Sequence, residues 1–160
     1  MKSSPIPQGF LLAHPLHFIA LGFGTGLSRV APGTVGTIVG FPLFLLLSPL
    51  DVALQWLIIA LLFAFGCHVC DVAGRALGVA DHGGIVWDEI VAYCMVLMTV
   101  PHHWAWWLAA FAAFRLFDIV KPWPIGWLDQ RFKNGFGVMV DDLMAAIYAV
   151  LVLALARVML

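Results

Sequence analysis

The fold is decided by Thr37–Gly66, which reads TIVGFPLFLLLSPLDVALQWLIIALLFAFG. Only the short piece Ser48–Asp51 and the amide of Gln55 interrupt this apolar run. A single helix needs about 20 residues to cross roughly 30 Å of hydrocarbon, so the run is too long for one crossing. We therefore predict a helical hairpin, with helices over residues 35–47 and 51–71 and a turn at Ser48-Pro49.

A similar pattern recurs further along the chain. Apolar segments over residues 88–100 and 105–118 flank Pro101-His102-His103-Trp104, which predicts a second hairpin, and residues 141–160 form another apolar segment. Phe10–Phe23 is interrupted by Pro15, which favours an interfacial position. Hydrophobic residues make up 63% of the chain and the mean hydropathy is +1.01, well above that of soluble domains. We predict an all-α fold, one domain over residues 1–160, built as a small polytopic membrane helical bundle of about four to five membrane helices.

The charges predict how this bundle is oriented. Five crossings place residues 1–34, 71–88 and 118–141 on one side of the membrane. That side carries Lys2, Arg29, Arg75, Arg115, Lys121, Arg131 and Lys133, whereas Arg157 lies on the other side. The positive-inside rule makes the cation-rich side the cytoplasmic face. The acidic and glycine-rich motifs are then clustered there, and the net charge of −1 argues against a nucleic-acid partner.

Carboxylates gather in short polar segments of this face, which we call polar islands; the last two are residues 81–89 and residues 118–124, the second leading on to Asp141-Asp142. Asp88-Glu89 and Asp141-Asp142 lie near predicted helix starts, where capping of free N–H groups is the simplest interpretation. Asp118 and Asp71 lie near predicted helix ends, where the helix dipole disfavours an anion. An ion pair is the simplest interpretation there: Asp71 with Arg75, and Asp118 with Arg115 or Lys121.

One hypothesis explains why so many acidic residues lie on this face: they bind a divalent cation that acts on a phosphate ester. Mg²⁺ prefers carboxylate oxygens, polarises a phosphoryl group and organises a water for attack. Arg115, Lys121 and Arg29 could neutralise phosphate charge. The sequence leaves open the number of metal ions, the general base and the roles of Asp71 and Asp81.

The segment before the first hairpin, residues 22–37, reads GFGTGLSRVAPGTVGT and leads directly into a helix. Glycines let backbone N–H groups approach an anion, hydroxyls donate hydrogen bonds, and a helix N-terminus favours phosphate. We therefore predict an anion cradle within this segment. His82, in the first acidic island, could bind phosphate or donate a proton, or it could be an exposed loop residue.

Three stretches of the chain, Gly22 to Thr37, Asp81 to Glu89 and Phe114 to Asp142, resemble the bacterial phosphatidylglycerophosphatase A family. The most specific pieces are His82-Gly83 with Ile85-Val86-Trp87-Asp88-Glu89, Phe114-Arg115 with Asp118 and Lys121-Pro122-Trp123-Pro124-Ile125, and Gly135-Phe136-Gly137-Val138-Met139-Val140-Asp141-Asp142. The resemblance implies a Mg²⁺-dependent, multi-pass enzyme of the bacterial inner membrane with its active site on the cytoplasmic side. It further implies removal of the terminal phosphate of phosphatidylglycerophosphate, giving phosphatidylglycerol.

The residues and the resemblance together predict a site. Metal ligands are expected at Asp88, Glu89, Asp118 and Asp142, and catalytic roles at these four and at Lys121 and Asp141. Substrate-binding residues are expected to be Gly24, Thr25, Ser28, Arg29, Thr34, Thr37, His82, Arg115 and Lys121. The expected partner is a phospholipid in the membrane, and nothing in the sequence indicates a homo-oligomer.

Other functions stay open at this point. The substrate could be another lipid phosphate. The carboxylates could instead line the pathway of a small cation transporter or channel subunit, but residues 35–47 and 90–100 contain almost no ionisable side chain. A membrane scaffold would have no use for acids at helix ends beside glycine-rich segments.

Overall fold

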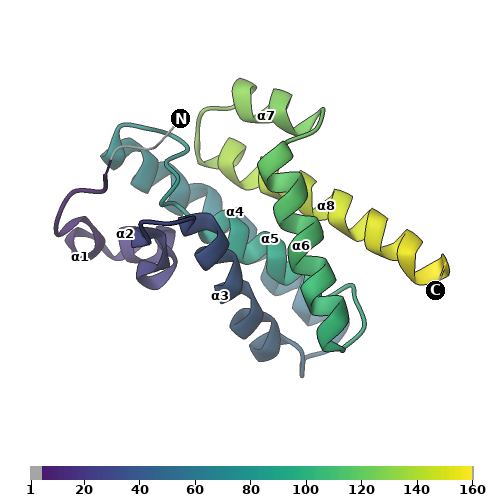
Figure 1. Ribbon diagram of the computed structural model, residues 1–160. Helices are drawn as coiled ribbons and strands as arrows, with labels where there is room; N and C mark the ends of the chain where they lie inside the picture. The colour runs from purple at the N-terminus through teal and green to yellow at the C-terminus, as the bar shows by residue number, and fades with distance from the viewer. Residues whose placement is uncertain (1–4, 160) are drawn as a thin grey trace.

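The computed structural model describes residues 5–159, which form helices and no strand, as predicted (Figure 1). Lys2, one of the cations of the predicted cytoplasmic face, lies outside the described residues. The elements in chain order are α1 (Phe10–Ala13), α2 (Pro15–Ala20), the 3₁₀ helix η1 (Gly22–Leu27), α3 (Pro32–Leu47), α4 (Val52–Leu77), α5 (Trp87–Leu97), α6 (Trp104–Val120), α7 (Ile125–Arg131) and α8 (Gly135–Met159).

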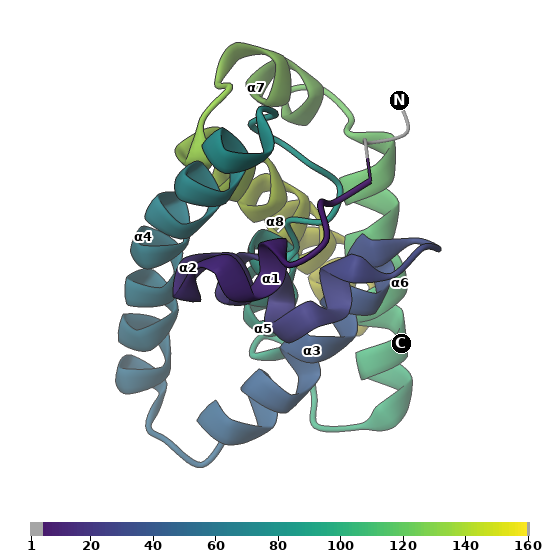
Figure 2. The same ribbon diagram turned by 90° about the vertical axis from the view of Figure 1, so that its left-hand side faces the viewer.

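Both predicted helix–turn–helix connections are confirmed, and their turns are stabilised by helix caps, although α3 and α4 diverge from their turn (Figure 2). Between α3 and α4, the Asp51 carboxylate accepts a hydrogen bond from the Leu54 N–H at 3.0 Å. Between α5 and α6, the His103 ring accepts one from the Ala105 N–H at 3.3 Å. Helix α4 ends later than predicted, because the chain continues helically until Gly78 adopts a left-handed conformation with φ of 72°.

Helix α5 is the centre of the bundle. Every residue from Trp87 to Leu97 is buried, and α3, α4, α6 and α8 all pack against it. Helix α3 comes closest, since a Cβ atom built on Gly40 would lie 2.7 Å from the Ile90 carbonyl oxygen. Small residues of this kind let two helix backbones approach in a membrane protein. The central helix therefore has a fixed position from which its first turn can present side chains.

The outer surface of the bundle is apolar. Helices α4 and α8 are both long and apolar enough to cross a membrane. Large side chains point outward from them, including Leu61 on α4 and Leu155 on α8, which are 60% and 62% exposed. A continuous apolar surface of this kind indicates contact with lipid. The protein is therefore membrane-associated.

The two ends of the bundle differ (Figure 2). One end holds the two hairpin turns, whereas the other holds the loop between α4 and α5, the short helix α7 and the start of α8. Helix α8 begins at Gly135 and not at Asp141, because the Asn134 side chain accepts a hydrogen bond from the Gly137 N–H at 3.0 Å and caps the earlier start. The capping interpretation of Asp141-Asp142 is therefore wrong, since α8 has no acid in its first turn.

Candidate active site

A cleft of about 1160 Å³ opens at the end of the bundle that carries α7. Its walls are the segment leading into α3, the loop between α4 and α5, the first turn of α5, the end of α6 and the early part of α8. The fold thus brings together residues that are far apart in the chain. All the predicted catalytic residues line this cleft: Asp88, Glu89, Asp118, Lys121, Asp141 and Asp142.

Arg115 organises the inner part of the cleft. Its Nη1 atom lies 2.6 Å from Glu89 Oε1 and 2.6 Å from Asp118 Oδ2. The side chains of all three residues are only 12–14% exposed. Asp88 and Asp142 line the same cleft. We call Asp88, Glu89, Arg115, Asp118 and Asp142 the Arg115 group.

Three carboxylates of the Arg115 group keep an oxygen atom that no donor reaches. These atoms are Asp88 Oδ1, Glu89 Oε2 and Asp142 Oδ2, for which residues 5–159 supply no hydrogen-bond partner. A buried polar atom without a partner is costly, so native structures rarely keep one without a role. Here only Glu89 and Asp118 pair with the Arg115 guanidinium, and carboxylate oxygens are the ligands that Mg²⁺ prefers. The residues present therefore fit a divalent cation.

Lys121 organises a second group nearer the rim. Its Nζ atom lies 2.5 Å from Asp141 Oδ2, 3.3 Å from Asp129 Oδ1 and 3.9 Å from Asp81 Oδ2. We call these four residues the Lys121 group. Burial alone would lower the pKa of Lys121, but the attraction of its acidic partners, Asp141 above all, outweighs burial and raises the pKa well above its usual range. Lys121 is therefore a permanent cation of the cleft.

Among the described residues, the Lys121 group, and not the Arg115 group, has carboxylate oxygens at the spacing of a metal site. Carboxylate oxygens of Asp81, Asp129 and Asp141 all lie within 4.8 Å of one another. However, the ammonium group of Lys121 already pairs with all three. A divalent cation would have to displace it or be repelled by it. The buried carboxylate oxygens without partners lie instead in the Arg115 group.

The glycine-rich segment is only partly brought to the cleft. Ser28 and Arg29 line it, whereas Gly24, Thr25, Thr34 and Thr37 are not among its lining residues. The hydroxyl groups of Thr25 and Thr37 donate to the carbonyl oxygens of Gly22 and Gly33, each at 2.8 Å. A threonine that bonds its own backbone in this way has no hydroxyl proton left for an anion.

Two neighbouring glycines of this segment, absent from the predicted site, do contribute to the cleft. A Cβ atom on Gly33 would collide with Glu89 Oε1, so the missing side chain lets this carboxylate lie against the first turn of α3. The free N–H groups of a helix start favour an anion at that place. A Cβ atom on Gly26 would likewise collide with the Gly84 carbonyl oxygen, so Gly26 allows the two loops to pack together.

Asp129 is a further residue that the sequence reasoning missed. It lies on α7, a helix that was not predicted, and it pairs with Lys121 and with Lys133, the latter at 3.7 Å. The signal was present in the sequence, because Asp129 lies four residues before Lys133 in a predicted polar island.

The structure also places His82 and Asp71, two of the residues whose roles the sequence left open. His82 lines the cleft but is only 3% exposed, and its Nδ1 atom accepts a hydrogen bond from the Gly84 N–H at 3.1 Å. The exposed-loop interpretation of His82 is therefore wrong. Asp71 is not a lining residue; it pairs with Arg75 at 2.7 Å and accepts a hydrogen bond from the Gly135 N–H at 3.4 Å. Its role is to connect α4 to the start of α8.

Comparisons with known proteins agree on one family. The family model described as Phosphatidylglycerophosphatase A matches residues 18–157. A Phosphatidylglycerophosphatase A of Haemophilus influenzae is 50% identical over 153 residues, which cover 94% of this chain and 93% of that protein. A Phosphatidylglycerophosphatase A of Escherichia coli is 39% identical over 137 residues, covering 85% of this chain and 80% of that protein.

A further relative, from Bacteroides thetaiotaomicron, is 41% identical over 149 residues, covering 87% of this chain and 91% of that protein. Its name gives phosphatidylinositol-3-phosphatase as a provisional activity. No solved structure matches this chain.

Proposed function

The chain belongs to the phosphatidylglycerophosphatase A family, and we infer that it hydrolyses the terminal phosphomonoester of phosphatidylglycerophosphate to phosphatidylglycerol and inorganic phosphate. The observation that carries this inference in the structure is the cleft itself. Buried carboxylates with unpartnered oxygens lie beside Arg115 and Lys121 at one end of an apolar bundle. Such a site can reach a phosphate at a membrane surface while the rest of the lipid stays in the bilayer.

The cofactor of this proposal is Mg²⁺, held by Asp88, Glu89 and Asp142, with Asp118 as the fourth ligand. The support is the set of oxygens without partners and their all-carboxylate chemistry. When bound, Mg²⁺ supplies electrophilic polarisation of the phosphoryl group and a higher local concentration of activated water.

The remaining residues of the cleft hold the substrate. Lys121 and the exposed Arg29 supply positive charge toward the phosphate oxygens, and Arg115 fixes the geometry of Glu89 and Asp118. Asp141 holds Lys121 in place through its 2.5 Å ion pair. His82 accepts a hydrogen bond from the Gly84 N–H and so stabilises the loop before α5. This loop in turn holds Asp88 and Glu89 in place in the first turn of α5.

We also propose that the protein is a multi-pass protein of the bacterial inner membrane with the cleft on the cytoplasmic side. Helices α4 and α8 are full crossings, and α3 and α6 are shorter crossings. Helix α5, with 11 residues, is only about 17 Å long and enters part of the way inside the bundle. The excess of Lys and Arg at the cleft end supports the orientation.

The first test is phosphate release from phosphatidylglycerophosphate by the purified protein in detergent, with Mg²⁺ and with excess chelator. We expect release only with Mg²⁺ and much less release from soluble glycerol phosphate. Arg75→Gln is the matched control, since Arg75 lies outside the cleft and its side chain is 80% exposed. Release that persists in chelator would overturn the metal assignment, and no release from a folded sample would overturn the activity.

A second candidate substrate follows from the relative in Bacteroides thetaiotaomicron, whose provisional name specifies a phosphoinositide. Phosphatidylinositol 3-phosphate therefore belongs in the same assay. We expect a kcat/KM at least about 100-fold lower than for phosphatidylglycerophosphate, a difference of about 3 kcal/mol in transition-state binding.

A further inference from the structure

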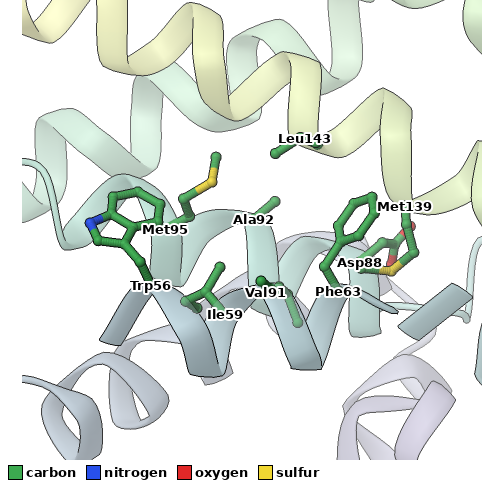
Figure 3. A pocket seen from close by; sticks show the side chains of 10 residues that line it. Trp56, Ile59, Phe63, Asp88, Val91, Ala92, Met95, Met139 and Leu143 are labelled. Atoms are coloured by element: carbon green, nitrogen blue, oxygen red, sulfur yellow. The ribbon is translucent and has the colours of Figure 1, made fainter. Parts of the chain in front are cut away.

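A second pocket lies against the cleft, and it is apolar. It has a volume of about 270 Å³ and lies between α4, α5 and α8 (Figure 3). The lining residues of α4 run from Trp56 to Phe63 at helical offsets of 0, 3, 4 and 7, and those of α5 run from Asp88 to Met95 at the same offsets. Two parallel stripes of side chains thus form a groove about 10 Å long. Its floor is the buried helix α5, and its walls are α4 and α8.

The groove and the cleft are neighbours that share one lining residue. Asp88 lines both, and it is the acidic residue of the groove. Figure 3 shows Asp88, Phe63 and Met139 at one end and Trp56 and Met95 at the other. The polar end of the groove is therefore the proposed metal and phosphate site, and its apolar end lies deeper in the bundle.

The walls of the groove are the two helices that are long enough to cross the membrane. Near the cleft they touch closely, because a Cβ atom on Gly66 of α4 would lie 2.6 Å from Met139 Sδ of α8. Further along, α8 extends away from the bundle (Figure 1). Ala60, on the α4 wall, is exposed even though it lines the groove. The groove is therefore open sideways toward lipid.

We propose that this groove holds one acyl chain of the phospholipid substrate while its phosphate lies in the cleft; this inference rests on the proposed function. The groove is too narrow for a partner helix, which has a diameter of about 10–12 Å. Its length is about two-thirds of one leaflet, taken as half of the roughly 30 Å hydrocarbon core. A single hydrocarbon chain fits these dimensions, and its polar end would meet Asp88.

The groove positions the acyl chain and adds little hydrophobic binding energy. Lipid tails are as apolar as the groove, so the hydrophobic effect contributes little when an acyl chain moves from the bilayer into the groove. Shape contacts with flexible side chains such as Met95 and Met139 hold the chain in one direction. Holding the chain fixes the distance of the phosphate from the carboxylates, and small misplacements at a reacting centre are costly in rate.

The test narrows the groove with Ala60→Phe and compares two substrates, a long-chain phosphatidylglycerophosphate and its six-carbon-chain analogue. We expect the ratio of kcat/KM for long over short chains to fall about tenfold or more. Ala112→Phe is the matched control, because Ala112 is an exposed alanine of α6 that does not line the groove. It should leave the ratio unchanged. An unchanged ratio in Ala60→Phe would overturn the proposal.

A second measurement does not depend on turnover. A phospholipid with a diazirine in one acyl chain is photolysed with the protein in bicelles, and the labelled peptides are identified. We expect label on residues 56–63 and 91–95, reduced by excess long-chain phosphatidylglycerophosphate and by Ala60→Phe. Label spread equally over α6 and insensitive to competitor would overturn the groove. An inactive wild-type protein that still shows competed groove labelling would overturn the proposed hydrolysis and keep the lipid site.

Discussion

The Arg115 group and the Lys121 group are neighbours in one cleft, yet they balance their charges differently. In the Arg115 group, one guanidinium pairs with two of the four carboxylates, and three carboxylate oxygens have no donor among the residues that the structure describes. In the Lys121 group, each of the acids pairs with the same ammonium. The Arg115 group is also the more buried, since the Asp118 side chain is 12% exposed and the Asp81 side chain 40%.

The Arg115 group has more negative charge than its own cation balances, whereas the Lys121 group holds a cation that contacts each of its acids. Buried carboxylates without a counter-charge are costly unless they bind a cation or take up a proton. A lysine among three acids needs no such cation, and it can in turn hold an anionic substrate at the rim. Substitutions in the two groups should therefore differ in their effect on Mg²⁺ binding and not only in their effect on rate.

The largest effect is expected for Asp142→Asn and Asp88→Asn. An amide carries no charge to hold the cation, so kcat should fall by more than about 1000-fold. Stability without metal should be unchanged or higher, because each substitution removes a buried, unpaired charge. For the wild type, Mg²⁺ at about 100 times its Kd should add about 2.7 kcal/mol to the free energy of unfolding, and this gain should disappear in both variants.

Calorimetry or a thermal shift in detergent, with and without Mg²⁺, checks this prediction alongside the phosphate assay. Arg75→Gln should keep both the activity and the Mg²⁺-dependent shift. An Asp142→Asn protein that retains a tenth of the activity and a normal shift would show that the unpartnered oxygens are not the metal site.

A smaller effect is expected for Asp118→Ala, about a 100-fold loss of kcat with the fold kept. Asp118 shares Arg115 with Glu89, so the guanidinium keeps a partner after the substitution. If Asp118 is a ligand, the Mg²⁺-dependent shift should fall; if it only positions Arg115, the shift should stay while the rate drops. The shift measured at several Mg²⁺ concentrations therefore separates the two roles.

In the Lys121 group, Lys121→Met should lower kcat/KM by about 30-fold, whereas Lys121→Arg should stay within about fivefold of the wild type. The Mg²⁺-dependent shift should survive both changes. Because the acids around Lys121 raise its pKa well above the usual range, it stays protonated throughout an assay range of pH. Lys121→Arg should therefore leave the alkaline limb of the pH–rate profile unmoved, and a displaced limb would identify Lys121 as a proton donor.

The sequence predicted which residues meet in the cleft better than it predicted how they pair. Turns marked by Ser48-Pro49 and Pro101 gave the two helix–turn–helix connections, and the alternating helix directions brought the polar segments to one end of the bundle. A predicted ion pair was wrong where the chain stops being helical. Lys121 was one expected partner of Asp118, but it lies beyond the end of α6 with a left-handed φ of 43° and pairs with Asp141 instead.

Local hydrogen bonds caused the other differences. The hydroxyl groups expected to face an anion were satisfied by their own turn, as for Thr37 and the Gly33 carbonyl. The start of α8 was displaced because Asn134, and not an aspartate, caps it. Which side chain caps a helix, and which carbonyl oxygen a hydroxyl group bonds, depends on the three-dimensional positions of these groups. Composition and residue spacing do not give those positions.

The smallest effect is expected for Asp129→Asn, a change of less than about threefold in kcat/KM. Asp129 is one of three acids around Lys121, its side chain is 25% exposed, and the stronger 2.5 Å pair with Asp141 would stay intact. The comparison with Asp142→Asn is isosteric, carboxylate to amide in both cases, and the two positions differ in burial and in whether the oxygens already have a cation. Parallel kinetics and Mg²⁺-dependent thermal shifts of the two variants measure that difference directly. If Asp129→Asn abolished the shift, the three acids around Lys121 would be the metal site and the ammonium would have to move when the metal binds.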